Sequence, residues 1–218
     1  MRLLFFGPPG AGKGTQAKIV AKEFNVEHIS TGDILREAVN KGTDLGEKVK
    51  SIMERGELVP DEIMNELVKQ KLEEVNSFIL DGYPRTLEQA KFLDAVLKQI
   101  KKEIDAAVLI DVPEDEIVKR ISNRRVCPNC GKVYNLITLK PKNDEKCDNC
   151  GTKIVQRDDD KENVVRERYR IYRKNTEPVI EYYRKNNKIV TVNGVQDVEE
   201  VTKELFNMLR RFRNNDNN

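Results

Sequence analysis

Residues 7–15 form a glycine-rich stretch, GPPGAGKGT, in which Lys13 could contact phosphate. An apolar run at residues 3–6 precedes it and a helical pattern at residues 16–24 follows it, which is the strand, turn and helix context of a phosphate-binding loop. The glycines let successive backbone N–H groups point at one anion, and the helix N-terminus adds positive charge. The stretch therefore predicts a site for nucleotide phosphates rather than a turn without a ligand.

The residue after the lysine departs from the general phosphate-loop pattern. That pattern places Ser or Thr directly after the lysine to hold magnesium. In this chain Gly14 stands there and Thr15 comes next. We therefore expect Mg²⁺ to travel with the nucleotide and to keep most of its water shell.

All four cysteines fall in two Cys-x2-Cys pairs, Cys127 with Cys130 and Cys147 with Cys150, and a glycine follows each pair. Four thiolates at this spacing suit a tetrahedral zinc ion, and four protein ligands leave no open coordination position. We therefore expect a structural Zn²⁺, one per chain, that supplies folding energy to a small insert. Disulfides or a redox pair are the less favoured alternatives, and iron in place of zinc stays open.

Several arginines fall where the helical pattern places apolar residues. We expect one helix at about residues 161–174, where Arg168 lies on the apolar face that includes Val165, at about 100° per residue. We expect another at residues 113–124, where Arg124 continues the row of Ile121, with Arg120 beside it. An arginine among core-facing residues needs a partner, which is either a carboxylate or a bound phosphate. On the second interpretation, two polyphosphates would be neutralised by Arg36, Arg85, Arg124, Arg157 and Arg168.

Apolar runs that alternate with helical patterns must position these residues. The candidate strands are residues 2–6, 26–29, 78–80, 106–110 and 188–192, which predicts an α/β fold with a five-stranded parallel sheet flanked by helices. Ligands of such sheets gather at the carboxyl ends of the strands, where Asp81 and Arg85 follow the third run. Residues 30–59 form a polar, glycine-bounded helical insert, and the cysteines belong to a second insert.

Two polar residues near these strands have structural explanations as well as functional ones. Gln89 stands three residues after Thr86, the spacing of a capping box at a helix N-terminus. His28, the only histidine, ends a predicted strand, where we expect a structural rather than a catalytic role.

Composition excludes several classes of protein. The 218 residues include 39 Lys and Arg against 37 Asp and Glu, so the net charge of +2 argues against a protein held to nucleic acid by bulk electrostatics. No apolar run reaches membrane-spanning length, and the run at residues 3–6 is too short for a signal peptide. We expect a cytoplasmic protein with no membrane partner.

Over essentially its whole length, the chain resembles the adenylate kinases. These enzymes belong to the nucleoside monophosphate kinases, which are a branch of the enzymes with the P-loop NTPase fold. The matching stretches are GPPGAGKGTQA, STGDILR, LDGYPRT, DVPEDEIVKRISNRRVCPNCG and RDDDKENVVRERY, and the cysteines are those of the zinc-binding, long-lid form. The resemblance implies a core of residues 1–29, 60–122 and 161–218, an insert at 30–59 that binds the monophosphate, and a lid at 123–160.

The resemblance also implies roles for individual residues. The ATP-binding residues would be Gly10, Ala11, Gly12, Lys13, Gly14, Thr15, Arg120, Arg124, Val133, Tyr134 and Gln196. The AMP-binding residues would be Thr31, Arg36, Glu57, Leu58, Val59, Gly82, Tyr83, Pro84, Arg85, Gln89, Arg157 and Arg168. The catalytic residues would be Lys13, Arg85, Arg124, Arg157, Arg168 and Asp81, with Asp81 ordering magnesium-bound water. Asp159 and Asp160 would help to close the lid.

The implied reaction is MgATP + AMP ⇌ MgADP + ADP in a monomer whose partners are ATP, AMP and ADP and not nucleic acid. Phosphoryl transfer needs in-line positioning and charge neutralisation more than a nucleophilic side chain, which suits this chain. A CMP or UMP kinase of the same fold is the nearest alternative, disfavoured by Thr31 and the long lid. A nucleic-acid-binding zinc ribbon would use Arg166, Arg170 and Arg173, but acidic residues interleave with them.

Overall fold

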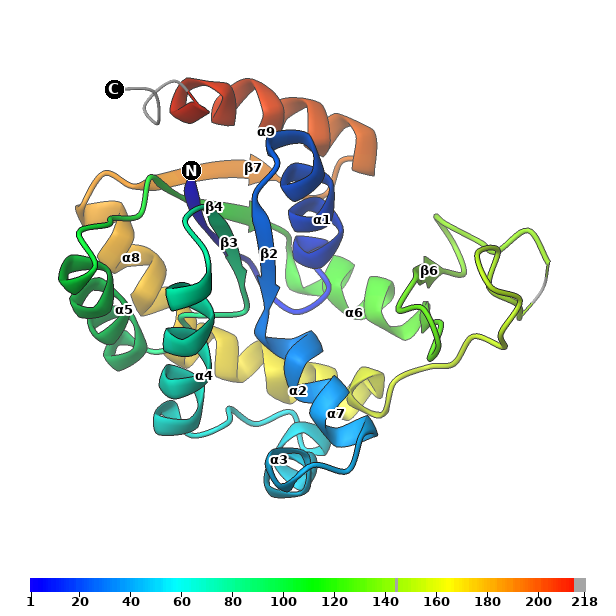
Figure 1. Ribbon diagram of the computed structural model, residues 1–218. Helices are drawn as coiled ribbons and strands as arrows, with labels where there is room; N and C mark the ends of the chain where they lie inside the picture. Colours follow the sequence, from blue (N-terminus) through cyan, green and yellow to red (C-terminus); the bar gives the residue numbers. More distant parts are fainter. Residues whose placement is uncertain (144, 214–218) are drawn as a thin grey trace.

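Five parallel strands form the centre of the protein, whose computed structural model describes residues 1–143 and 145–213 (Figure 1). The strands are β1 (Arg2–Phe6), β2 (Glu27–Ser30), β3 (Phe78–Asp81), β4 (Ala106–Asp111) and β7 (Ile189–Asn193). Their order in the sheet is β2-β3-β1-β4-β7. This confirms the predicted α/β class and all five predicted strands, with ends that shift by one residue at most.

Helices cover both faces of the sheet, so the inner strands β1, β3 and β4 bury two rows of side chains. In β1, Leu3 and Phe5 enter one core and Leu4 and Phe6 the other. The first core is closed by α1 (Lys13–Phe24) and α9 (Val198–Arg213), which lie together in Figure 1. The second core is closed by α4 (Asp61–Glu74), α5 (Leu87–Gln99) and α8 (Glu177–Lys185). Burial on both faces explains why these three inner strands are continuous apolar runs, whereas the edge strand β7 alternates between buried and exposed residues.

Two segments project beyond this layered core at the carboxyl ends of the strands. The first contains α2 (Thr31–Asn40) and α3 (Asp44–Glu54), whose N-termini are capped by Ser30 and Thr43. The second follows α6 (Glu114–Ser122) and contains the hairpin of β5 (Arg124–Val126) and β6 (Val133–Asn135). Figure 1 shows this second segment extending away from the sheet before the chain returns through η1 (Asp158–Asp160) to α7 (Glu162–Ile171).

Two helices differ from the sequence prediction. The helix expected to run to residue 124 ends at Ser122, and Arg124 instead pairs with Asn135 at the base of the hairpin. The Asn135 side chain donates to the carbonyl of Arg120 and so takes up a helix-end acceptor. The helix expected at residues 161–174 is α-helical only to Ile171 and continues as a π-helical turn, η2 (Tyr172–Thr176). None of the described helices is both long enough and apolar enough to cross a membrane.

Candidate functional site

The loop between β1 and α1 has the backbone that the glycine pattern predicts. Gly10 and Gly12 have φ values of 79° and 92°, in the left-handed region that favours glycine. A Cβ at Gly10 would also come within 2.5 Å of the Ile121 Cγ1 atom, so this glycine is needed for packing as well. Gly12 is the N-cap residue of α1 and no side chain of the described residues caps that helix, which leaves its first N–H groups for a ligand.

The ammonium of Lys13 lies over this loop. Its Nζ donates to the carbonyl oxygens of Gly7 and Pro8, at 2.7 and 2.9 Å. Burial lowers the pKa of Lys13 to about 8, a shift that Asp81 opposes and that the nearby guanidinium of Arg85 reinforces. A buried ammonium with this surplus of positive charge around it is stabilised by an incoming anion.

Three arginines act on the lysine, Arg85 after the end of β3, Arg124 from β5 and Arg168 from α7. A fourth, Arg157 from the segment before η1, lies near Arg124 and Arg36. Arg168 donates to Asp159 Oδ2 at 2.7 Å, and Arg124 pairs with Asp160. The carboxylate partner that we weighed as an alternative is therefore present for these two arginines.

The other two arginines lack such a partner. Within the described residues, neither Arg85 nor Arg157 forms an ion pair with a carboxylate, although burial lowers the pKa of both. The pKa of Arg157 falls to about 10, first through burial and then through repulsion by Arg36. Partly buried guanidiniums without a paired carboxylate leave this cleft short of negative charge, which is the environment that a polyphosphate requires.

Asp81 is the carboxylate nearest to the loop. It ends β3 and is 9% exposed, and its Oδ2 atom lies 3.5 Å from Nε2 of His28 on the adjacent strand. A Cβ at Gly14 would come within 3.3 Å of the same oxygen. Glycine after the lysine therefore leaves room for the Asp81 carboxylate, which explains the departure from the general loop pattern. We expected a structural role for His28 from the sequence, and through its contact with Asp81 this residue also borders the site.

A pocket lies between the insert, the end of β3 and α7. Of the predicted AMP-binding residues, those that line it are Thr31, Arg36, Glu57, Leu58, Val59, Gly82, Arg85, Gln89 and Arg168. The Thr31 hydroxyl donates to the carbonyl of Gly82, at 3.1 Å, and Arg36 donates to Asp33. The structure thus brings together most of the residues predicted to bind AMP. Tyr83, Pro84 and Arg157 are not among the residues that line this pocket.

The side chain of Gln89 is fixed within this pocket by protein contacts. Its Oε1 accepts the backbone N–H of Arg85 and its Nε2 donates to Asp61, both at 2.7 Å, and the residue is 2% exposed. Only half of the predicted capping box forms, because Thr86 accepts the N–H of Gln89 while the Gln89 side chain turns elsewhere. Sequence reasoning missed Asp61, since nothing distinguished it from an ordinary acid in the first turn of a helix.

Among the other predicted ATP-binding residues, Arg120 contacts the turn that precedes Gln196. Arg120 donates to the carbonyl oxygens of Gly194 and Val195, at 2.8 and 3.3 Å, next to the exposed Gln196. In β6, Val133 is partly exposed, but the side chain of Tyr134 is buried within its own segment.

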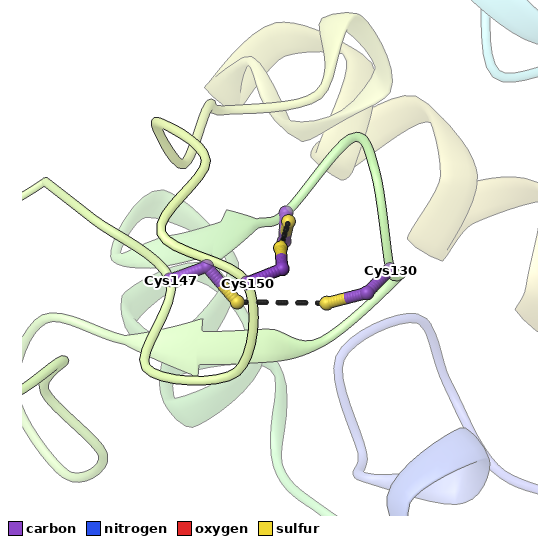
Figure 2. Close-up of side chains that lie close together, drawn as sticks. Cys130, Cys147 and Cys150 are labelled. Atoms are coloured by element: carbon purple, nitrogen blue, oxygen red, sulfur yellow. Dashed lines mark hydrogen bonds between the residues drawn. The ribbon is translucent and has the colours of Figure 1, made fainter.

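The four cysteine sulfurs converge in the second segment, as Figure 2 shows for the labelled residues. All four Sγ atoms lie within 4.8 Å of one another, with 3.4 Å between Cys127 and Cys150 and 3.5 Å between Cys130 and Cys147. These distances exceed a disulfide bond of about 2.05 Å. They approach the roughly 3.8 Å between sulfurs that zinc–sulfur bonds of about 2.3 Å imply in a tetrahedron. The donor set therefore fits one tetrahedral, thiolate-binding metal ion.

Comparisons with known proteins agree with one another. A protein-family model described as adenylate kinase matches residues 5–188. The chain is 79% identical over 212 residues to the adenylate kinase of Petrotoga mobilis, a match that covers 97% of this chain and 99% of the relative. It is 56% identical over 214 residues to that of Thermosipho africanus, covering 97% and 100%, and 56% identical over 216 residues to that of Archaeoglobus fulgidus, covering 98% and 100%.

Proposed function

The chain belongs to the adenylate kinase family of nucleoside monophosphate kinases, and we propose that it catalyses MgATP + AMP ⇌ MgADP + ADP by positioning and charge neutralisation in a closed cleft. The observation that carries this mechanism is the group of partly buried cations around Lys13. Arg85, Arg168 and Arg124 lie close enough to the Lys13 ammonium for the charge of each to lower its pKa further. Charge of this sign and density matches the negative charge spread over a phosphoryl group in transfer.

ATP occupies the loop side of the cleft in this proposal. The backbone of residues 10–15 holds its phosphates, and the Lys13 ammonium exchanges its two carbonyl partners for phosphate oxygens. Arg120, which already contacts residues 194 and 195, holds the nucleotide beside Gln196. Val133 and the backbone of Tyr134 close over it from the second segment.

AMP occupies the pocket beside the insert. Its phosphate contacts Arg36 and Arg85, and its base lies against residues 57–59 and Gln89, whose amide can read an adenine edge. Arg157 and Arg168 bridge the donor and acceptor phosphates from the segment that leads into α7. The remaining acceptor contacts come from Thr31 and from the backbone of residues 82–84.

The chain's own groups then favour in-line transfer. Arg124 and Arg168 keep Asp159 and Asp160 against the cleft, so that the segment closes as the phosphates arrive. The insert at residues 30–59 and the lid at 123–160 exclude water, which would otherwise accept the phosphoryl group. Bound magnesium would supply positive charge to the phosphate oxygens, and Asp81 would hold its water shell.

The four cysteines hold a structural zinc in this proposal. The ion has no open coordination position and takes no part in the transfer. The enzyme acts as a cytoplasmic monomer on ATP, AMP and ADP.

The decisive experiment measures nucleoside diphosphate production from MgATP with AMP, CMP, UMP or GMP, each supplied separately. A rate found mainly with AMP supports the proposal. A preference for CMP or UMP keeps the mechanism and overturns the acceptor. The absence of transfer to any of them, from folded protein with metal bound, overturns the function.

A further inference from the structure

The side chain of Tyr134 lies inside the second segment rather than toward the cleft. It is 1% exposed and packs with Cys127, Cys147 and Ile154 in a small core of its own. Side chains alternate along a strand, so its neighbour Val133 in β6 faces the opposite way. Strand β6 therefore has one face on the cysteine cluster and one face available to a nucleotide.

Both hydrogen-bonding functions of the Tyr134 hydroxyl are used on the second cysteine pair. The hydroxyl lies 3.4 Å from Sγ of Cys147, to which it donates, and accepts the backbone N–H of Asp148 at 2.7 Å. Because that N–H occupies an oxygen lone pair, the phenolic proton is directed at the sulfur. The Lys132 ammonium lies 5.3 Å from the ring centroid of Tyr134 and 3.8 Å from Asp148 Oδ2, so it contacts both the ring and the second stretch.

The two cysteine pairs come from separate stretches, and Tyr134 connects them. Cys127 and Cys130 lie in the turn between β5 and β6, whereas Cys147 and Cys150 lie beyond it in the chain. The backbone of Tyr134 lies in the first stretch, where it pairs with Arg125. Its hydroxyl contacts the second stretch, at Cys147.

We propose that Tyr134 is a positioning residue that links the metal centre to the nucleotide-facing strand. Four thiolates around a divalent ion retain net negative charge, and a hydrogen bond to one of them is charge-assisted and therefore strong. Through this bond the metal fixes the side chain of Tyr134, and so fixes the position of Val133. The inference rests on the proposed function, because it assumes zinc at the cysteines and ATP beneath β6.

Tyr134→Phe tests the link, since it removes only the hydroxyl. Thr152→Val is the matched control: the Thr152 hydroxyl lies 3.4 Å from Cys150 Sγ, but this residue belongs to no strand of the hairpin. The readouts are zinc release to a chromogenic chelator, the thiolate-to-cobalt charge-transfer band of the Co²⁺-substituted protein, and KM for ATP and for AMP. The zinc content and ATP–AMP activity of the unaltered enzyme are measured first, so failure of the proposed function is seen separately.

We expect Y134F to release zinc about 10- to 100-fold faster, as loss of an outer-shell partner does elsewhere, and to shift the charge-transfer band. We expect its KM for ATP to rise severalfold while its KM for AMP holds. T152V should speed zinc release and leave both KM values at those of the parent. Unchanged zinc release in Y134F overturns the hydrogen bond to the thiolate, and faster release with an unchanged KM for ATP overturns the positioning role.

If Y134F fails to fold, the intact enzyme loaded with ¹¹³Cd offers the same test. A scalar coupling between cadmium and the Tyr134 hydroxyl proton, transmitted through the Cys147 sulfur, is expected. An observed hydroxyl proton without that coupling overturns the proposal.

Discussion

Gly56 lies directly against the side chain of Arg168. A Cβ at position 56 would come within 2.7 Å of Arg168 Cγ and within 2.8 Å of Val164 Cγ1. Arg168 in turn donates to Asp159 at the end of the second segment. The absence of a side chain at position 56 thus lets the insert at residues 30–59 pack against α7 at the wall of the proposed AMP pocket. The end of the second segment, at Asp159, meets α7 at the same place.

Gly56→Ala should impair catalysis through that contact. The added methyl group pushes Arg168 out of place, and misplacement of a phosphate-binding group by about 1 Å can cost on the order of 100-fold in rate. We expect kcat to fall and KM for AMP to rise, each by tenfold or so, in steady-state assays with both substrates varied.

Gly42→Ala is the control for this prediction, because backbone strain alone also has a cost. Gly42 has a φ of 62° and Gly56 a φ of 73°, but a Cβ at Gly42 meets nothing within 4 Å. Both variants should therefore lose about 1–2 kcal/mol of unfolding free energy, measured with denaturant. Equal kinetics in the two variants would show that the contact with Arg168 does not matter.

Lys13→Ala should reduce turnover on the order of 10²–10³-fold, the usual cost of removing one preorganised donor from a transition state. Arg85→Ala should have an effect of similar size. Zinc content should stay at the parent level in both variants, because neither residue belongs to the cysteine cluster. Lys22→Ala, an exposed lysine of the same helix, is the control and should retain parent activity. Full activity in K13A would contradict the proposed function.

Binding of MgATP should take up protons near pH 8. Lys13 has a pKa of about 8 in the free enzyme against an ordinary 10.5, so about half of it is neutral at pH 8. Phosphate beside the ammonium raises that pKa, and we expect uptake of roughly half a proton per site. Titration calorimetry in buffers of different ionisation enthalpy measures this uptake, and Lys13→Met should abolish it. Equal uptake by K13M would assign the protons to another group.

The lowered pKa of Lys13 also makes the free energy of unfolding depend on pH in a defined direction. Between about pH 8 and 10.5 the unfolded chain binds more protons at this lysine than the native state does. The contribution of Lys13 to the free energy of unfolding therefore rises with pH across that window and is most unfavourable below pH 8. K13M should be more stable than the parent at pH 7, and the difference should shrink toward pH 10.5.

The sheet and the phosphate loop could be predicted because local patterns determine them. A strand buried on both faces is a continuous apolar run, and a loop with φ above zero at residues 10 and 12 needs glycine. Arg124 shows where local patterns mislead, since its spacing continues a helix that ends at Ser122. Arg124 is partly buried, with its side chain 17% exposed, but it lies in strand β5 and not in the helix that the spacing indicated.

Contacts between distant segments could not be predicted. Asp61 holds Gln89 from another helix, and the Tyr134 hydroxyl reaches Cys147 across a hairpin. No spacing in the sequence encodes either distance, because both depend on how separate elements pack. The left-handed conformation of Gly56 could be suspected from its residue type, but its contact with Arg168 could not.

Asp61→Ala should weaken AMP recognition through Gln89. Without Asp61 the Gln89 amide loses its acceptor and Thr86 loses one as well, and each unsatisfied buried group costs about 1–3 kcal/mol. We expect KM for AMP to rise about tenfold, discrimination against CMP to fall, and KM for ATP to hold. Glu62→Ala, the exposed neighbour in the same turn, is the control. Unchanged discrimination in D61A would show that the Gln89 amide does not read the base.

Cys130→Ser should remove the metal and loosen the second segment alone. Cys130 is exposed, so the change leaves no cavity, and the core beside it consists only of Cys127, Tyr134, Cys147 and Ile154 among the described residues. Such a core cannot hold the segment without a metal, whereas the two cores of the sheet do not include these residues. Hydrogen exchange should therefore accelerate across residues 126–156 and stay slow in β1, β3 and β4. Chelation of the parent enzyme should reproduce this pattern and added zinc should reverse it. Protected amides at residues 126–156 in metal-free protein would contradict a structural role for the ion.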